Sequence, residues 1–222
     1  VLIILSIVFT TSCAQYSFGR LEIDKVLFIN AVGIDRANDG SDDIIITSAI
    51  KSANMPSVSK SGTSESKAKT KIITTRGTTT SEAIRNIYAY SDKRAFYGDA
   101  EYILVGEEAA KDNILKYLDF FFRDHELRLN SKVLIVKEDN AQTLMKKIAD
   151  EDIFIGELLK NLFGNNKQLS ISDEIPIIEI MNMFDNTYMS PYIPCIEIKS
   201  DVHDNPSEKS SEDQLELTGF AV

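Results

Sequence analysis

The sequence predicts an α+β fold in which helices pack on a mixed β-sheet. Short apolar runs suit buried strands, and apolar residues at helical spacing lie between those runs. Strand and helix patterns alternate from residue 71 to residue 149, and a hairpin pattern precedes them. A hairpin pairs antiparallel strands, whereas strand-helix-strand units pair parallel ones, so we expect a sheet that contains both.

Composition bounds the function before any motif is considered. The 222 residues suffice for one large domain or two modest ones, and 43% of them are hydrophobic. The net charge of −10 argues against a protein that wraps nucleic acid, whose phosphates attract a basic surface. Two cysteines and two histidines leave few ligands for a metal site or a disulfide framework.

The first apolar run predicts a hairpin. Residues 26–34 read as a buried strand, Asp39-Gly40 is the expected reversal, and residues 44–47 read as the returning strand. The acids of this turn, from Asp35 to Asp43, are typical of a solvated loop. A calcium loop is the alternative, because carboxylates are hard oxygen ligands, but their spacing does not match an EF-hand.

The segment 51–80 has a different character from the rest of the chain. Thirteen of its thirty residues are Ser or Thr, and it carries six basic residues against the single acid Glu65. We expect residues 55–70 to form a flexible Ser/Lys-rich loop. The loop is either a solvated insertion in a long hairpin or a basic arm on an anionic membrane surface.

Further elements follow in order. Thr79 and Glu82 have capping-box spacing and predict a helix that continues to Ser91. Glu107 and Glu108 predict the start of a second helix, because acids are favoured in a first turn. The remaining expected strands are 71–75, 102–105, 132–136, 192–198 and 215–222, and the remaining helices are 142–149, 157–163 and 175–184.

The first thirteen residues predict a lipid anchor. The apolar run 1–9 is too short to cross a membrane, which needs about 20 residues, but it suits the hydrophobic part of a secretory signal. Thr11 and Ser12 before Cys13 resemble a bacterial lipobox, in which the cysteine is acylated and becomes the new amino terminus. Thr10 departs from that pattern. The alternative is a buried strand at 1–9 with Cys13 as an ordinary core thiol.

Motifs for catalysis are missing from the sequence. It has no glycine-rich phosphate loop and no Gly-x-Ser-x-Gly nucleophile motif. His125 has acidic neighbours, but a basic side chain at a helix end is also favoured by the helix dipole. We therefore expect no catalytic residues, no metal and no cofactor.

Arg94, Phe96 and Tyr97 form an Arg-plus-aromatic cluster of the type enriched at binding hot spots. They are candidates for partner contact. The alternative is that Arg94 pairs with an acid at the edge of the core while both aromatic rings are packed. Arg123 and Asp124 are further candidates, although the acids of residues 120–128 can also pair with Arg123 and Arg128.

Three stretches together resemble the Ger(x)C family, the lipoprotein C subunits of bacterial spore germinant receptors. They are Glu22-Ile23-Asp24 with Val32-Gly33-Ile34-Asp35, then Arg94-Ala95-Phe96-Tyr97-Gly98 with Val105-Gly106-Glu107, then Leu118-Asp119-Phe120-Phe121-Phe122-Arg123-Asp124 with the strand 133–136. The late Gly219-Phe220-Ala221-Val222 resembles the start of that family's C-terminal domain. The order and spacing of these stretches behind a lipobox-like cysteine make the resemblance fairly specific.

The resemblance implies a multi-domain α+β lipoprotein on the outer face of the spore inner membrane. It would assemble with a multi-span A subunit, a transporter-like B subunit and a small D protein, and it would have no assigned catalytic residues. We expect a signal remnant at 1–12, an N-terminal region at 13–195, and at 196–222 an acidic linker with the truncated start of the C-terminal domain. A solute-binding lipoprotein that delivers a small ligand to a transporter is the second hypothesis, and a cell-wall hydrolase has the least support.

Overall fold

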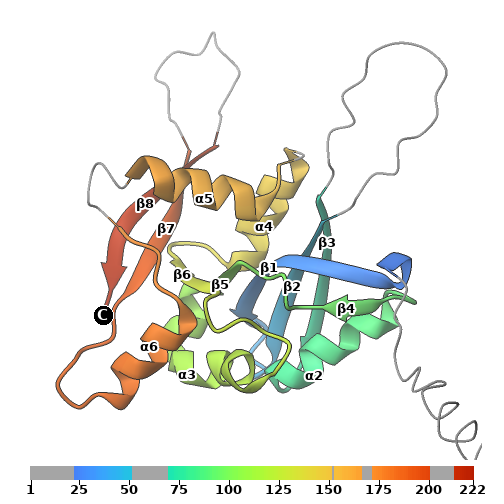
Figure 1. Cartoon of the computed structure of the whole chain (residues 1–222), viewed down its shortest axis with the longest axis horizontal. Coiled ribbons are helices and arrows are strands. Elements are labelled where there is room, and N and C mark those ends of the chain that lie inside the picture. The colour runs from blue at the N-terminus through green and yellow to red at the C-terminus, as the bar shows by residue number, and fades with distance from the viewer. Residues whose placement is uncertain (1–22, 52–69, 152, 167–171, 201–212) are drawn as a thin grey trace, which may run out of the picture.

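The computed structural model describes residues 23–51, 70–151, 153–166, 172–200 and 213–222 (Figure 1). Within them, eight strands form one mixed sheet and five α-helices pack on it as a single body. The strands are β1 (Val26–Arg36), β2 (Ile44–Lys51), β3 (Thr70–Gly77), β4 (Arg94–Phe96), β5 (Tyr102–Gly106), β6 (Lys132–Val136), β7 (Ile193–Ser200) and β8 (Asp213–Ala221). The α-helices are α2 (Thr80–Arg85), α3 (Glu107–Arg123), α4 (Ala141–Asp150), α5 (Ile155–Asn166) and α6 (Ile177–Asp185).

The strands follow the order β3-β2-β1-β5-β6-β7-β8, and β4 pairs with the beginning of β1. The pairs β1–β5, β5–β6 and β6–β7 are parallel. The pairs β1–β2, β2–β3 and β7–β8 are antiparallel. The predicted mixed sheet is therefore confirmed, and so is the hairpin whose second strand returns at Ile44.

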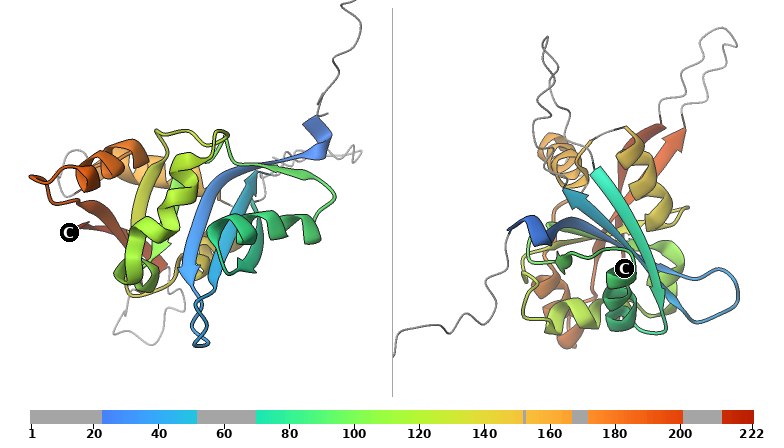
Figure 2. Two further views of the ribbon diagram at one scale, coloured as in Figure 1. Left: turned by 90° about the horizontal axis from the view of Figure 1, so that it is seen from below. Right: turned by 90° about the vertical axis from the view of Figure 1, so that its right-hand side faces the viewer.

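Helices cover both faces of the sheet (Figures 1 and 2). Helices α4 and α5 pack on one face, where Leu144, Met145 and Leu159 are fully buried. Helices α2, α3 and α6 pack on the other face, where Tyr117 and Phe121 are among the largest buried side chains. Because β1 is covered on both faces, it is buried without a break from Ile29 to Asp35, as expected for an inner strand.

The first predicted helix is shorter than its sequence pattern. The Thr79 hydroxyl accepts a hydrogen bond from the backbone N–H of Glu82 at 3.1 Å, so the predicted cap forms. The Glu82 carboxylate accepts from the backbone N–H of Thr78 at 2.9 Å, and a hydrogen bond with the backbone of Thr79 also helps to lower its pKa. Helix α2 ends at Arg85, and a 3-10 turn, Asn86–Ala89, continues the chain where the sequence predicts regular helix up to Ser91.

The last strand joins the sheet of the preceding residues. Strand β8 pairs antiparallel with β7, and Gly219, at φ +105°, lies at a bulge in that pairing. The domain boundary expected after residue 195 falls inside β7, and it stays a prediction.

The expected loop at residues 55–70 lies largely outside the described residues. The described residues on either side of this gap, Lys51 and Thr70, both contact residues just before α5. The Thr70 hydroxyl donates to the carbonyl of Ile153 at 2.9 Å, and the Lys51 ammonium lies over the ring of Phe154.

Two glycines give opposite predictions for the same substitution. A Cβ atom on Gly77, at the end of β3, would lie 2.5 Å from the backbone nitrogen of Ala83, so alanine there must displace backbone. Gly77→Ala should lower the free energy of unfolding by about 1–3 kcal/mol, the usual effect of overpacking. Gly164→Ala, in α5 with open space around the position, should raise it by about 0.5–1 kcal/mol. Urea unfolding measures both changes, and equal destabilisation by the two substitutions would contradict the packing described at Gly77.

Candidate functional site

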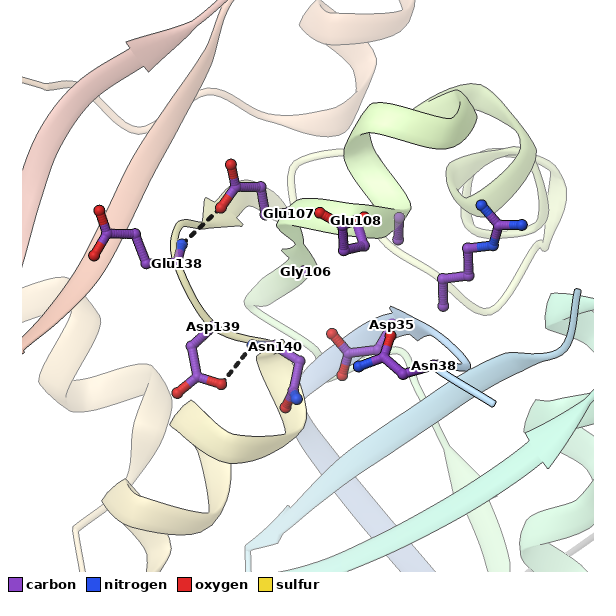
Figure 3. Close-up of a pocket in the computed structure, with 10 residues that line it drawn as sticks. Asp35, Asn38, Gly106, Glu107, Glu108, Glu138, Asp139 and Asn140 are labelled. Atoms are coloured by element: carbon purple, nitrogen blue, oxygen red, sulfur yellow. Dashed lines mark hydrogen bonds between the residues drawn. The ribbon is translucent and has the colours of Figure 1, made fainter. Parts of the chain in front are cut away.

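The carboxyl ends of β1, β5 and β6 meet at one edge of the sheet, which we call the carboxyl edge. Parallel α/β sheets bind ligands outside this edge, where successive helices leave to opposite faces. Here α3 follows β5 on one face and α4 follows β6 on the other. A hollow of about 240 Å³ lies between the two helix starts (Figure 3).

Asp35, the next-to-last residue of β1, occupies the start of α4. One carboxylate oxygen accepts the backbone N–H of Ala141 at 2.7 Å, and the other accepts that of Gln142 at 2.8 Å. The side chain of Asn140 caps the same helix by accepting the N–H of Thr143 at 2.7 Å. The first three N–H groups of α4 are therefore all satisfied by side chains of the protein, in the place where a helix N-terminus could bind an anionic ligand.

Burial dominates the electrostatics of Asp35. The residue is 4% exposed, and burial raises the pKa of its carboxyl group from 3.8 to about 6. The hydrogen bonds from Ala141 and Gln142 act in the opposite direction, because they favour the charged form, and the charge of Asp139 adds to the increase. Gly106 leaves room for this carboxylate, since a Cβ atom at that position would collide with an Asp35 oxygen.

Glu107, the first residue of α3, fixes the turn before α4, whereas the start of α3 itself has no side-chain cap among the described residues. The Glu107 carboxylate accepts the backbone N–H of Glu138 at 2.7 Å (Figure 3). It also pairs with the Lys111 ammonium at 2.9 Å. These contacts hold the pKa of Glu107 below its usual range. Glu138, at φ +61°, is thereby held in the turn between β6 and α4. Asp35 and Glu107 therefore use the carboxyl edge to join β1, β5 and β6 to the helices that follow them.

A second constellation contains three of the sequence-predicted contact residues. Arg94 on β4 forms an ion pair with Glu126, and the Phe96 ring packs edge-on against Phe28 at 6.0 Å between centroids. Gly98 lies against both segments, because a Cβ atom there would be 2.5 Å from the Phe96 ring and 2.8 Å from the Glu126 carbonyl oxygen. Asp124 accepts the backbone N–H of Glu126 at 2.8 Å and shapes the loop that presents it. We call this the 94–126 junction.

Tyr97 and Arg123 lie outside the exposed part of that junction. Tyr97 is 6% exposed, its hydroxyl lies 3.2 Å from that of Ser48, and burial raises its pKa to about 12. It ties the junction to β2. Arg123, in the last turn of α3, donates to Asp119 at 2.7 Å. Together with Asp124 and His125, it lines a separate hollow between α3 and the start of α2.

The acids of the first turn are held by arginines. Arg76 pairs with Asp39 at 2.6 Å and with Asp43 at 2.7 Å, while Arg36 pairs with Asp42 at 2.8 Å. The serine at position 41 and Arg76 together lower the pKa of Asp39 to about 2. Across the described ranges, no three His, Cys, Asp or Glu side chains are grouped to hold a metal ion.

The structure describes one of the two cysteines, Cys195. Cys13 lies outside the described residues. Cys195, on β7, is 2% exposed, and burial raises the pKa of its thiol. In the part of the chain that the structure describes, no helix has the length and apolar character needed to span a bilayer.

Sequence reasoning missed the roles of Asp35 and Gly106, both of which lie inside quoted motifs. Asp35 follows the apolar run of β1 directly, and an acid at the end of a buried strand was the available signal. Its partners, Ala141 and Gln142, are more than a hundred positions later, and no local pattern connects them.

Fold and site together define an α+β domain with a three-layer body in which the protein's own side chains occupy the start of α4 at the carboxyl edge. Residues 19–198 match the family model described as spore germination protein N-terminal domain, and the chain belongs to this family. It is 24% identical over 196 residues to spore germination protein KC of Bacillus subtilis (strain 168). The aligned residues cover 87% of this chain and 47% of that protein. The chain thus spans about half the length of this curated relative. No solved structure matches it.

The raised pKa of Asp35 predicts a pH dependence of stability. A carboxyl group with a raised pKa stabilises the folded state most below its unfolded value of 3.8 and loses this contribution as pH rises through about 6. Relative to Asp35→Asn, the free energy of unfolding of the wild type should therefore fall by up to about 3 kcal/mol between pH 4 and pH 7. Urea unfolding across this range measures the difference. The exposed control Asp92→Asn should follow the wild-type profile, and parallel profiles for wild type and Asp35→Asn would refute the assignment.

Proposed function

We propose that this chain is part of a lipid-anchored, non-catalytic subunit of a spore nutrient-germinant receptor. In this proposal it assembles with the membrane A and B subunits on the outer face of the spore inner membrane and helps to trigger germination. Membership of the spore germination protein N-terminal domain family supports the proposal, as does the similarity to spore germination protein KC.

The structural observation that carries the proposal is the start of α4, which the protein's own side chains occupy. The N–H donors there that would bind a phosphate or carboxylate substrate in an open sheet are bonded to Asp35 and Asn140, and Glu107 holds the turn before this helix through the N–H of Glu138. Those bonds make the edge a rigid junction between strands and helices. A rigid body of this kind is suited to presenting surfaces to neighbouring subunits, which is the role proposed here.

The proposed contact surface is centred on the 94–126 junction. Arg94 and Phe96 are at least partly exposed there, and Arg–aromatic groups are enriched at binding hot spots. Arg123 and Asp124 extend the surface toward the end of α3. Tyr97 belongs to it as a buried support, because its hydroxyl reaches Ser48 behind the surface.

The anchor at Cys13 is tested by labelling with palmitate. Radiolabelled palmitate should enter the wild-type protein expressed in a sporulating bacterium, and the Cys13→Ala variant should lose the label, because only that thiol follows a lipobox-like sequence. Cys195→Ala is the matched control and should keep the label, since the Cys195 thiol is buried. Equal labelling of the wild type and Cys13→Ala would end the lipid-anchor proposal.

The contact surface is tested by combining assembly with stability. Arg94→Ala should reduce recovery of A and B subunits with the tagged protein at least several-fold in spore inner membranes. Its free energy of unfolding should change by no more than about 1 kcal/mol, because partly exposed ion pairs contribute little to stability. Arg85→Ala, an exposed arginine on α2, should leave recovery unchanged. Full recovery with Arg94→Ala would remove the junction from the interface.

A further inference from the structure

An apolar cavity of about 360 Å³ lies between α3, α6 and the β7–β8 pair. Helices α3 and α6 lie on the same side of the sheet (Figure 1). The cavity volume falls within the range of small-ligand pockets, roughly 300–1,000 Å³, near its lower end. The walls are formed mainly by Ile114, Ile135, Phe184, Ile193, Cys195 and Ala221.

Three charged side chains lie at the rim of this cavity, and two of them already have partners. Glu107 and Lys111 form an ion pair at 2.9 Å, and Lys111 also reaches Glu108 at 3.3 Å. The Lys137 ammonium makes no ion pair within 4.0 Å with any residue in the described ranges. Among the residues that the structure describes, the rim therefore presents one positive charge without an ion-pair partner, next to an apolar interior.

The position of Lys137 fits a charge that acts at the cavity wall. Lys137 lines the cavity together with Glu107 and Cys195, and its ammonium lowers the pKa of Glu107 and opposes the rise that burial causes in the pKa of the Cys195 thiol. Cys195 itself stays neutral, and its Sγ donates to the carbonyl of Ile193 at 3.7 Å. The wall below the rim is thus uncharged.

We propose that this cavity binds a small apolar carboxylate, with its hydrocarbon part against Ile114, Ile135 and Phe184 and its carboxylate at Lys137. An apolar interior selects against a polar solute, because buried polar groups without partners are costly. The unpaired ammonium selects an anionic head, and the pair formed by Glu107 and Lys111 leaves no second free charge for a zwitterion. This site is distinct from the 94–126 junction and does not depend on the proposed receptor role.

Unbranched monocarboxylates of increasing length probe both parts of the site. Each buried methylene contributes enough to strengthen binding about fourfold, so affinity should rise by about that factor per methylene from butyrate through hexanoate to octanoate. Titration calorimetry on the full chain, purified without detergent, measures the series. Octanol has the same apolar chain without the charge, and it should bind at least tenfold more weakly than octanoate.

Two variants separate the head-group contact from the apolar contact. Lys137→Gln should weaken octanoate binding at least tenfold and leave octanol binding unchanged, because only the charge is removed. Lys160→Gln, an exposed lysine on α5, is the matched control and should bind octanoate as the wild type does. Ala110→Phe on α3 places a ring in the cavity and should abolish binding of both compounds.

Three outcomes would overturn the proposal. The first is no heat of binding with octanoate at millimolar concentration, and the second is an affinity that does not change with chain length. The third is equal octanoate affinity in the wild type and Lys137→Gln. Since Lys137 is only partly buried, its variant remains informative even where Ala110→Phe fails to fold.

Discussion

The contact between Asp35 and the start of α4 joins the two halves of the fold. Strand β1 lies inside the sheet, between the antiparallel strands β2 and β3 on one side and the parallel strands β5 and β6 on the other. Its carboxylate binds two backbone N–H groups of a helix that begins more than a hundred residues later. Burial of a charge is tolerated when its oxygens are fully bonded, and here each oxygen has a backbone donor. Gly106 on the neighbouring strand leaves the space that this arrangement needs.

The same contact connects β1 to the start of α4 at the carboxyl edge. In many parallel sheets the helix N-termini at this edge hold phosphate or carboxylate ligands. Here Asp35 occupies the start of α4, and Glu107 ties the turn before α4 to the start of α3. The two recognition surfaces proposed here are the 94–126 junction and the apolar cavity beside α3. These two surfaces are formed by different elements and differ in character: one has a partly exposed ion pair, and the other is a partly open hollow with an apolar wall.

Local sequence patterns predicted most of the elements. The apolar runs placed β1, β2, β5 and β6 within a few residues, because inner strands with two covered faces have a continuous apolar signal. The capping prediction at Thr79 was confirmed, but the length of α2 was not, because the helix gives way to a 3-10 turn after Arg85.

The candidate site was harder to predict, because its contacts are non-local. Asp35 reaches Ala141, and Arg94 reaches Glu126 across more than thirty residues. A pattern in one segment cannot specify which distant segment it meets. The place of β8 was missed for the same reason: only its pairing with β7 assigns it to this sheet.

The pairing of β4 with the first residues of β1 would limit how far the 94–126 junction lies from a bilayer if Cys13 carries the proposed lipid. Val26 is opposite Arg94 in that pairing, so the 94–126 junction lies beside the first residues that the structure describes. Ten peptide units separate position 13 from Ile23, and even a fully extended chain of that length reaches no more than about 36 Å. An acylated thiol at position 13 would thus keep Ile23 within that distance of the lipid headgroups and the adjacent junction within reach of membrane-embedded neighbours.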